Sequence, residues 1–283
     1  MYSRFFVLLT MENKSVSILG CGWLGLSLAN KLVSENYLVK GSTTSEENLK
    51  GLEALKIVPF KIKLNPGSEG DISFFDSELL FINIPPKTRS MGENFHLEQI
   101  KTLNDLIESN RFIKKIIFIS STSVYPSTGQ MLKEREALPL HFLVKAEKLL
   151  SEVCLSLGIK FTVLRFGGLM GYDRIPCRYF GGGKGLIDGN SLVNYIHRDD
   201  AIGVISTILN QNLWGEIFNV VSPSHPSRKQ IVECCCNPYG YATPTFSELH
   251  NTMEYKTISV EKLLEVSNYV FKFPDPLKFS YLH

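Results

Sequence analysis

The sequence predicts an α/β fold, in which a Rossmann-type doubly wound parallel sheet carries a small C-terminal lobe. Two observations lead to this prediction. Short β-branched apolar runs alternate with segments of helical periodicity through the first two-thirds of the chain, as in successive βαβ units. A glycine-rich turn also joins the first apolar run to the first helical segment, where folds of this class bind their ligands.

Six apolar runs are the predicted strands of the sheet. They are Val16–Leu19, Tyr37–Lys40, Ile57–Ile62, Leu79–Ile82, Ile116–Ile119 and Phe161–Leu164. Apolar residues recur at helical spacing between them and predict three helices with one buried face each. The recurring positions are Leu24, Leu28 and Leu32, then Ile100, Leu103 and Ile107, then Leu143, Ala146, Leu150 and Val153.

The pattern changes after Gly171. Short strands near Leu192–Ile196 and Ile217–Val221 flank a helix from about Asp199 to Leu209. Gly181–Gly185, which includes Lys184, is expected to be a loop that either holds a phosphate or acts as a lid. We therefore predict a Rossmann domain over residues 11–171 and a smaller lobe over 172–283. Residues 1–10 are expected to be a tail or a mis-assigned start.

Composition excludes several classes of partner. The 30 basic and 28 acidic residues are spread along the chain and leave a formal charge of +2. Neither nucleic acid nor a charged membrane surface is therefore expected as a partner. No apolar run is long enough to span a membrane. We expect a cytoplasmic protein.

The six cysteines are expected to be reduced thiols. A chain of this size needs no disulfides, and the run Cys234–Cys236 is a poor disulfide framework because its members are adjacent. Neighbouring side chains on a helix also point in different directions, so they seldom converge on one ion. No metal site is predicted.

A G-x-G-x-x-G motif follows the first predicted strand and opens the first predicted helix. Gly20 permits the tight turn, Gly22 lets the backbone approach a pyrophosphate, and Gly25 allows close packing of helix on strand. The N-terminus of the helix faces the negative charge. The motif predicts a dinucleotide site that includes Gly20, Cys21, Gly22, Trp23, Leu24 and Gly25.

The end of the second strand bears on the choice between NAD and NADP. An NAD site usually places an acidic residue there to hold the ribose 2′-hydroxyl. In this chain the strand runs into Ser42, Thr43 and Thr44, and the first acidic residue is Glu46. Hydroxyl groups can donate to a 2′-phosphate, which a carboxylate would repel. The pattern favours NADP over NAD, although no arginine supports it.

Several segments together resemble the extended short-chain dehydrogenase/reductases, the NAD-dependent epimerase/dehydratase group. The segments are Ile119–Tyr125, Leu164–Phe166 with Met170–Gly171, and Asn194–Ala201. The glycine motif and Asn83–Pro86 are similar to those of atypical members, and the likeness runs in order from Ser15 to Val221.

The resemblance implies a Rossmann core that binds NAD(P) and a C-terminal lobe that closes over a small-molecule substrate, often a nucleotide-linked sugar. It adds Asn83, Ile84, Pro85, Ser120 and Phe166 to the expected cofactor contacts. It also implies a homodimer, because the helices near Phe95–Ser109 and Phe142–Leu155 resemble the pair that forms a four-helix interface in this group.

Ser121 matches the family hydroxyl that hydrogen-bonds the reacting oxygen of the substrate. The alternative is a serine that satisfies backbone groups at a strand end. Dehydratases of the group carry acidic residues at the next two positions, where this chain has Thr122 and Ser123. Because neither hydroxyl can act as a general acid near neutral pH, a sugar 4,6-dehydratase is not expected.

The Tyr-x-x-x-Lys pair of the family is replaced. Aligning Glu147 with the family glutamate puts Pro139 and Leu143 at the two positions, and neither can transfer a proton. A shift of two residues offers His141 and Lys145 instead, but helical spacing places both on the polar side of their helix.

His197, Asp199 and Asp200 allow two interpretations. They are either a metal or acid–base cluster, or a helix start in which an aspartate caps the helix and His197 supports the lobe. We favour the second.

Two hypotheses of function remain from the sequence. The first is an NAD(P)-dependent oxidoreductase or epimerase with an atypical active site. The alternative is a dinucleotide-binding protein without catalysis, acting as a redox sensor or scaffold.

Overall fold

A computed structural model describes residues 14–65, 67–180, 188–246 and 255–281 of the chain. The chain divides into two compact units. Unit 1 comprises Met1–Ile119 and Ala146–Phe161, and unit 2 comprises Ser120–Lys145 and Thr162–His283. The predicted tail over residues 1–10 and the predicted loop Gly181–Gly185 lie outside the described residues. The predicted division of the chain after residue 171 stays a prediction.

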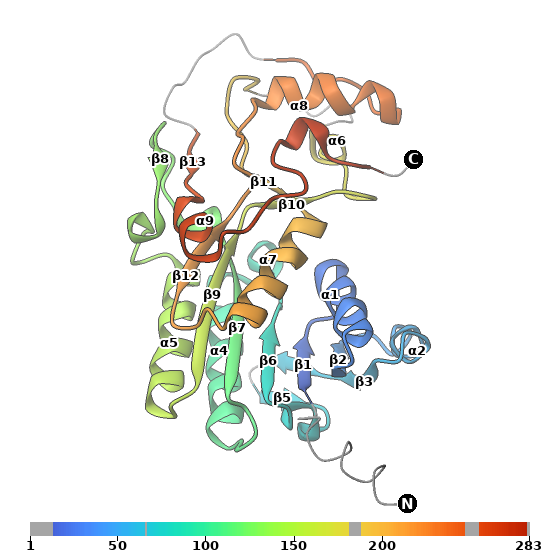
Figure 1. Cartoon of the computed structure of the whole chain (residues 1–283), viewed down its shortest axis with the longest axis vertical. Coiled ribbons are helices and arrows are strands. Elements are labelled where there is room, and N and C mark those ends of the chain that lie inside the picture. Colours follow the sequence, from blue (N-terminus) through green and yellow to red (C-terminus); the bar gives the residue numbers. More distant parts are fainter. Residues whose placement is uncertain (1–13, 66, 181–187, 247–254, 282–283) are drawn as a thin grey trace, which may run out of the picture. The chain divides into compact units, whose positions relative to one another are not determined.

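Seven strands form one sheet in the order β12-β9-β7-β6-β1-β2-β3 (Figure 1). They are β1 (Ser15–Leu19), β2 (Leu38–Thr43), β3 (Val58–Lys61), β6 (Leu79–Ile82), β7 (Lys115–Ser121), β9 (Lys160–Phe166) and β12 (Ile217–Val220). The strands pair in parallel, and the order reverses at β1, whose neighbours are β2 and β6. The predicted doubly wound α/β fold is confirmed.

In unit 1, helix α1 (Trp23–Ser34) packs against β1 and β2. Its buried residues include the predicted Leu24, Leu28 and Leu32, because positions three or four apart share one face of a helix. Helix α4 (Glu93–Glu108) likewise buries Ile100, Leu103 and Ile107. Smaller elements complete the unit: α2 (Leu49–Ala54), β4 (Lys63–Asn65), β5 (Gly67–Glu69), η1 (Ile72–Phe75) and α3 (Thr88–Met91).

Helix α5 (Phe142–Ser156) and the remaining elements, which belong to unit 2, follow β7. These elements are η2 (Thr122–Val124), β8 (Met131–Leu132), η3 (Glu134–Glu136), β10 (Gly168–Met170), α6 (Cys177–Phe180), β11 (Tyr195–His197), α7 (Arg198–Gln211), α8 (Arg228–Cys235), η4 (Asn237–Tyr239), β13 (Thr257–Ile258), α9 (Glu261–Ser267) and η5 (Pro276–Lys278). The strand predicted near Leu192–Ile196 begins only at Tyr195. Before it, Leu192 forms an isolated bridge with Ser227 and the Val193 amide donates to the Pro226 carbonyl.

Unit 2 has a hydrophobic core in which three cysteines take part. Cys177, Cys235 and Cys236 are buried among Ile175, Tyr195, Ile231 and other apolar side chains. Cys177 and Cys236 form a disulfide, so the expectation of six reduced thiols was wrong. That expectation considered only adjacent cysteines, whereas the partner of Cys236 lies 59 residues earlier in the chain.

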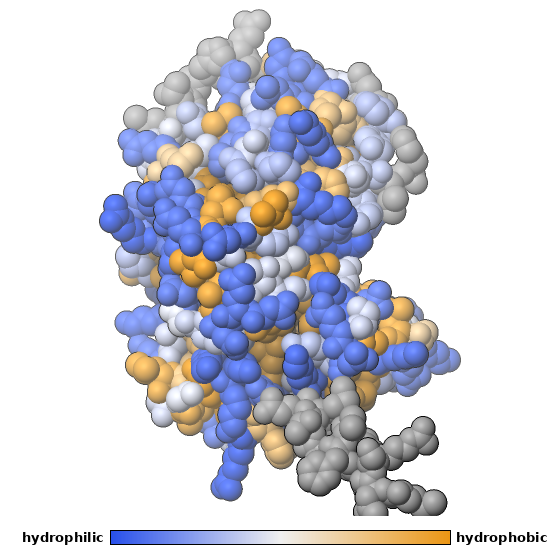
Figure 2. Space-filling view, in the orientation of Figure 1, coloured by the Kyte–Doolittle hydropathy of each residue, from blue (hydrophilic) through white to orange (hydrophobic). Residues whose placement is uncertain are grey.

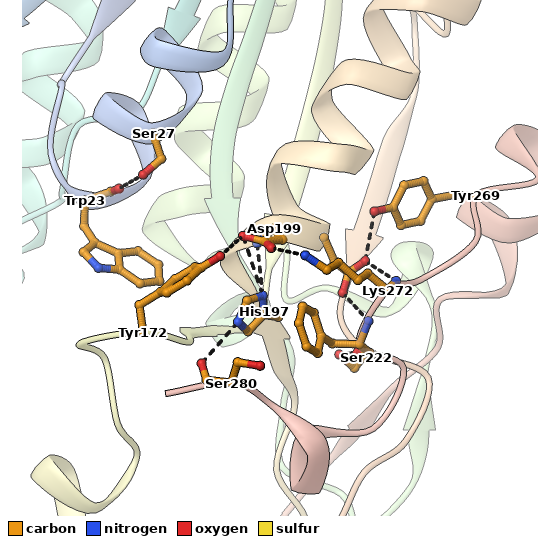
Figure 3. Close-up of polar contacts among 11 residues, drawn as sticks. Trp23, Ser27, Tyr172, His197, Asp199, Ser222, Tyr269, Lys272 and Ser280 are labelled. Atoms are coloured by element: carbon orange, nitrogen blue, oxygen red, sulfur yellow. Dashed lines mark hydrogen bonds and ion pairs between the residues drawn. The ribbon is translucent and has the colours of Figure 1, made fainter. Parts of the chain in front are cut away.

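The start of helix α7 corrects a second prediction. The helix cap is His197, whose Nδ1 accepts a hydrogen bond from the Asp199 amide at 3.2 Å, rather than an aspartate. Asp199 instead accepts from the Tyr172 hydroxyl and the Lys272 ammonium, at 2.8 and 2.7 Å (Figure 3). Burial lowers the pKa of His197, which favours a neutral ring that can accept this bond.

Asp200 holds the C-terminal segment of unit 2. Its carboxylate is fully buried and accepts hydrogen bonds from the Tyr269 hydroxyl at 2.9 Å and from the amides of Lys272 and Phe273 at 2.7 and 2.8 Å. A buried carboxylate is stable only when its oxygens are bonded in this way. The histidine and the two aspartates thus all have structural partners.

Hydrophilic side chains are interspersed with small apolar patches on the face drawn in Figure 2. Among the described helices, none is long and apolar enough to cross a membrane. Helices α4 and α5 contain the two segments expected at a homodimer interface, and that interface stays a prediction.

We expect Asp200→Asn to lower the free energy of unfolding by about 2–4 kcal/mol, because the NH2 group of the variant would face at least one buried donor that now meets a carboxylate oxygen. Asp199→Asn is the matched control. In its ion pair, the Lys272 side chain is 65% exposed and that of Asp199 25%, so water screens the pair and the loss should be smaller, about 1 kcal/mol. Urea unfolding of both variants measures the difference. Equal losses would contradict the anchoring role of Asp200.

Candidate functional site

The glycine motif forms a tight turn between β1 and α1. Gly20 has φ of +102°, a conformation that side chains other than glycine rarely adopt. Gly22 is the N-cap of α1, with φ of −80° and no side-chain cap. The first amides of the helix therefore point outward without a capping side chain, which suits an anionic ligand.

Both neighbouring strands hold this turn in place. From the end of β2, the Ser42 hydroxyl accepts from the Gly20 amide at 2.9 Å, and the Ser42 carbonyl accepts from the Cys21 amide at 2.8 Å. From the end of β6, the Asn83 side-chain amide donates to the Gly20 carbonyl at 3.0 Å. Ser42 and Asn83 therefore position the loop, a role that the sequence did not assign to them.

The three glycines differ in what surrounds them. A Cβ on Gly20 would lie 2.5 Å from the Asn83 carbonyl oxygen, and one on Gly25 would overlap the Gly20 carbonyl. A Cβ on Gly22 would meet no protein atom within 4 Å. Gly20 and Gly25 are thus required by the fold, whereas the space in front of Gly22 is open.

A cavity of about 540 Å³ lies in front of the turn within unit 1. It gathers nine of the residues predicted to contact a cofactor: Gly20, Cys21, Gly22, Ser42, Thr43, Thr44, Asn83, Ile84 and Pro85. Trp23, Leu24 and Gly25 are outside its lining, and Leu24 and Gly25 are buried in α1. Ser120 and Phe166 belong to unit 2, and their predicted role stays a prediction.

Two lysines in this lining were missed by the sequence analysis. Lys63 follows β3, and Lys87 precedes α3, while none of the described lining residues is acidic. Lys63 pairs with Glu69 at 3.2 Å on the surface, a contact that costs little to exchange. Since β2 and β3 are parallel neighbours, their carboxyl ends meet at one edge. This rule could have placed Lys63 beside Thr43 and Thr44.

Cys21 is in the cavity but is not a reactive thiol. Burial raises the pKa of Cys21 to about 12, so the sulfur stays protonated near neutral pH. It lies against β2, where a Cβ on Gly41 would come within 2.8 Å of its Sγ. The side chain therefore fills space between the turn and β2.

In unit 2, Ser121 ends β7 and caps the short helix η2. Its Oγ accepts from the Ser123 amide at 3.1 Å, as the alternative interpretation of this serine expected. The hydroxyl hydrogen is not used by that bond, so the same group can still donate to a ligand. Capping and substrate binding are compatible for Ser121.

Two of the segments that carried the family resemblance, those of Tyr125 and Arg165, meet in a buried network. The Tyr125 hydroxyl donates to Asn219 Oδ1 at 2.5 Å and accepts from Arg165 Nη1 at 2.9 Å. Arg165 also donates to the Glu134 carbonyl at 2.7 Å. Burial raises the pKa of Tyr125, so this phenol remains protonated and has a structural role.

His141 and Lys145, the shifted acid–base pair, have ordinary helix-start roles. His141 Nδ1 accepts from the Leu143 amide at 3.2 Å, and its ring stacks on Phe142 with centroids 4.8 Å apart. Lys145 is exposed, whereas Leu143 and Ala146 are buried. These positions agree with the polar side that helical spacing predicted.

A second cavity, of about 290 Å³, lies within unit 2. Its polar lining includes Thr122, which directly follows Ser121, together with Asn194, Arg228 and Lys256. Asn194 fixes the segment that carries Lys256, because its side chain donates to the Lys256 carbonyl and accepts from the Ile258 amide. Two cations and no acidic residue among the described lining groups suit an anionic ligand.

Two curated proteins of Escherichia coli are similar to this chain in sequence. No family model matches the chain. Protein YeeZ of Escherichia coli K12 is 30% identical over 272 residues, which cover 93% of this chain and 98% of that protein. Protein YeeZ of Escherichia coli O157:H7 matches to the same extent.

Solved structures with the same fold include nucleotide-sugar epimerases. A UDP-glucuronic acid 4-epimerase from Bacillus cereus in complex with NAD has a TM-score of 0.74 at 17% identity, covering 94% of this chain and 97% of that one. A UDP-glucose 4-epimerase from Thermotoga maritima with UDP-glucose has a TM-score of 0.66 at 16% identity, covering 89% and 91%. The fold is that of the extended short-chain dehydrogenase/reductases, as the sequence resemblance predicted.

We expect Gly20→Ala and Gly25→Ala to lower the free energy of unfolding by about 1–3 kcal/mol each, through backbone strain and overlap with carbonyl oxygens. Gly22→Ala should change it by roughly 0.5 kcal/mol or less, because its φ and surroundings accept a methyl group. Urea unfolding of the three variants measures this order. If Gly22→Ala were as unstable as the other two variants, the space in front of Gly22 would not be open.

Proposed function

This chain belongs to the family of Escherichia coli Protein YeeZ, and we propose that it is an NAD(P)-dependent oxidoreductase or epimerase acting on a nucleotide-linked small molecule. The observation that carries the proposal is the loop at the start of α1. Its conformation is fixed in advance by Ser42 and Asn83, and the space before Gly22 is open. A pyrophosphate at this position would meet the N-terminus of a helix.

The lining of the unit 1 cavity supports NADP as the preferred dinucleotide. Thr43 and Thr44 offer hydroxyl donors, Lys63 offers a positive charge, and no described lining residue is acidic. A 2′-phosphate would gain charge-assisted hydrogen bonds there. An NAD site would instead need a carboxylate for the ribose hydroxyls. Lys63 is the residue that we assign to this preference.

The unit 2 cavity supports an anionic substrate. Arg228 and Lys256 supply positive charge, and Asn194 holds the Lys256 segment by two hydrogen bonds between its side chain and the backbone. Solved structures of this fold include complexes with UDP-glucose and UDP-glucuronic acid. We therefore propose a diphosphate between the two cations as the ligand of this cavity. Because Thr122 lines the cavity and directly follows Ser121, this ligand would lie close to Ser121.

In the proposed reaction, the dinucleotide and Ser121 carry the chemistry. A bound dinucleotide would supply hydride transfer. Ser121 would donate its hydroxyl hydrogen to the substrate oxygen on which charge develops, while its Oγ still accepts from the Ser123 amide. Thr122 and Ser123 lack acidic groups, which keeps a sugar 4,6-dehydratase outside the proposal.

We expect the wild-type protein to bind NADP with a dissociation constant between nanomolar and micromolar, and NAD more weakly. Gly22→Ala should weaken both dinucleotides by about tenfold or more, because the methyl group takes the place of the pyrophosphate. Lys63→Ala should weaken NADP by about tenfold and leave NAD unchanged, since only NADP has the 2′-phosphate. Calorimetry with both dinucleotides measures these constants.

Two matched controls accompany this titration. Gly51→Ala adds a methyl group in open space on α2, and Lys61→Ala removes an exposed lysine outside the cavity lining. Both should bind like wild type. Folded wild-type protein that binds neither dinucleotide would refute the proposed function. Equal losses for NADP and NAD in Lys63→Ala would refute only the assigned preference.

For catalysis, we expect Ser121→Ala to reduce turnover by about a hundredfold, because one donor to the developing charge is lost. His141→Ala and Lys145→Ala should change turnover little, since one starts a helix and the other is exposed. Chromatography of a panel of UDP-linked sugars incubated with enzyme and dinucleotide measures turnover.

The three variants separate the hypotheses. Large losses at both His141 and Lys145 would show that the shifted pair is the acid–base pair of this chain. Indifference at all three positions, with dinucleotide binding intact, would favour a non-catalytic redox sensor or scaffold.

A further inference from the structure

Three cysteine sulfurs lie together in the core of unit 2, and none of them has a role in the function proposed above. Cys177 and Cys236 form a disulfide, and Cys235 Sγ lies 2.9 Å from Cys177 Sγ. All three Sγ atoms lie within 4.8 Å of one another and are buried. Cys177 therefore has two sulfurs within reach, either of which could be its disulfide partner.

The disulfide joins the two elements that carry part of the unit 2 cavity. Cys177 begins α6, whose last residue, Phe180, lines the cavity. Cys236 directly follows α8, whose first residue, Arg228, lines the same cavity. A change at the sulfurs therefore acts on the elements that hold an apolar wall and a cation of this site.

The disulfide is one of the contacts that hold helix α6, beside the hydrogen bond from Arg178 Nε to the Tyr241 hydroxyl. The helix has four residues, about one turn, and so short a helix is not stable without tertiary contacts. Two separate thiols need more room than a disulfide, because bonded sulfurs lie closer together than non-bonded ones. Cys235 already lies against Cys177, and cores are close-packed, so reduction must displace part of α6 or α8.

We propose that Cys177, Cys235 and Cys236 form a thiol–disulfide centre that fixes the wall of the unit 2 cavity when oxidised and loosens it when reduced. The effect on ligand affinity rests on the proposed function, because it assumes that the cavity binds a nucleotide. The chemistry of the sulfurs and the loosening of α6 do not rest on it.

The oxidant that we assign to the centre is a low-molecular-weight disulfide such as glutathione disulfide. After local opening of α6, the Cys177 thiolate attacks one sulfur of glutathione disulfide, and one glutathione thiolate leaves. The Cys236 thiolate then attacks the Cys177 sulfur of the mixed disulfide, and the second glutathione thiolate leaves. The two cysteines lose two electrons to glutathione disulfide, and their two protons balance the two glutathione thiols formed.

Cys235 is an alternative disulfide partner for Cys177 in this centre. Burial raises the pKa of Cys235 to about 12, so its thiol is protonated near neutral pH and does not attack the Cys177–Cys236 bond. Its sulfur nevertheless lies close enough to Cys177 to replace Cys236 when that residue is absent. The arrangement thus predicts which single substitutions keep a cross-link and which remove it.

Peptide mapping after equilibration in glutathione buffers tests the sulfur chemistry. Wild type and Cys235→Ser should form the Cys177–Cys236 bond, and Cys236→Ser should form Cys177–Cys235. Cys177→Ser should form neither. Cys234→Ser, which changes the exposed neighbour outside the cluster, should match wild type. The proposed centre would be overturned if Cys177 stayed reduced in a buffer of glutathione disulfide alone. It would also be overturned if Cys236→Ser formed no cross-link.

Limited trypsin digestion of the oxidised and reduced wild-type protein tests the loosening without any ligand. Arg178 is an exposed residue of α6, so cleavage after it reports local opening. We expect reduction to raise this rate roughly tenfold or more, because loss of a cross-link favours the open state. Cleavage after Lys148, exposed on α5, should keep its rate. Equal rates after Arg178 in both forms would overturn the proposal.

Calorimetry with UDP tests the effect on the cavity. The oxidised protein should bind UDP at least about fivefold more tightly than the reduced one, because a preordered site loses less freedom on binding. Equal affinities would overturn the link between the centre and the cavity. If UDP binds neither form, the proposed substrate class is wrong, and the cleavage ratio after Arg178 alone decides the centre.

Discussion

The close approach of Gly20, Gly25 and Asn83 is the constraint on which unit 1 depends. Gly20 adopts a positive φ directly under the carbonyl of Asn83, which follows β6, and Gly25 packs on the Gly20 carbonyl. No side chain fits at either contact, so α1 can leave β1 at this angle only with glycine at both positions. The position of the first helix, and of the amides at its start, follows from these contacts.

This constraint lies at the point where the order of the strands reverses. β1 has β2 on one side and β6 on the other, and each neighbour contributes one polar residue, Ser42 or Asn83, to the turn. Ligands of open α/β sheets bind outside the carboxyl ends of the strands at such a point. Because the turn is held by the protein itself, binding of an anion need not order it, which favours affinity.

Much of the sheet was predictable, because buried parallel strands are continuous β-branched apolar runs that can be read locally. The roles of Gly20 and Gly25 were predictable for a similar reason, since the motif encodes its own turn. The cap at His197 and the Cys177–Cys236 bond were not, and Lys63 could be placed only once β2 and β3 were known to be neighbours. Each depends on a neighbour that is distant in sequence or on a competing donor, and a single sequence does not show which distant residues meet.

The central claim is that the turn before α1 is a dinucleotide site. Native mass spectrometry of the folded wild-type chain, incubated with an excess of NADP, tests it most directly. We expect a complex whose mass exceeds that of the free chain by one NADP. An excess of an NADP analogue that keeps the pyrophosphate should replace NADP in this complex. A folded chain that stays free of dinucleotide under these conditions, with NAD as well as with NADP, would contradict the central claim.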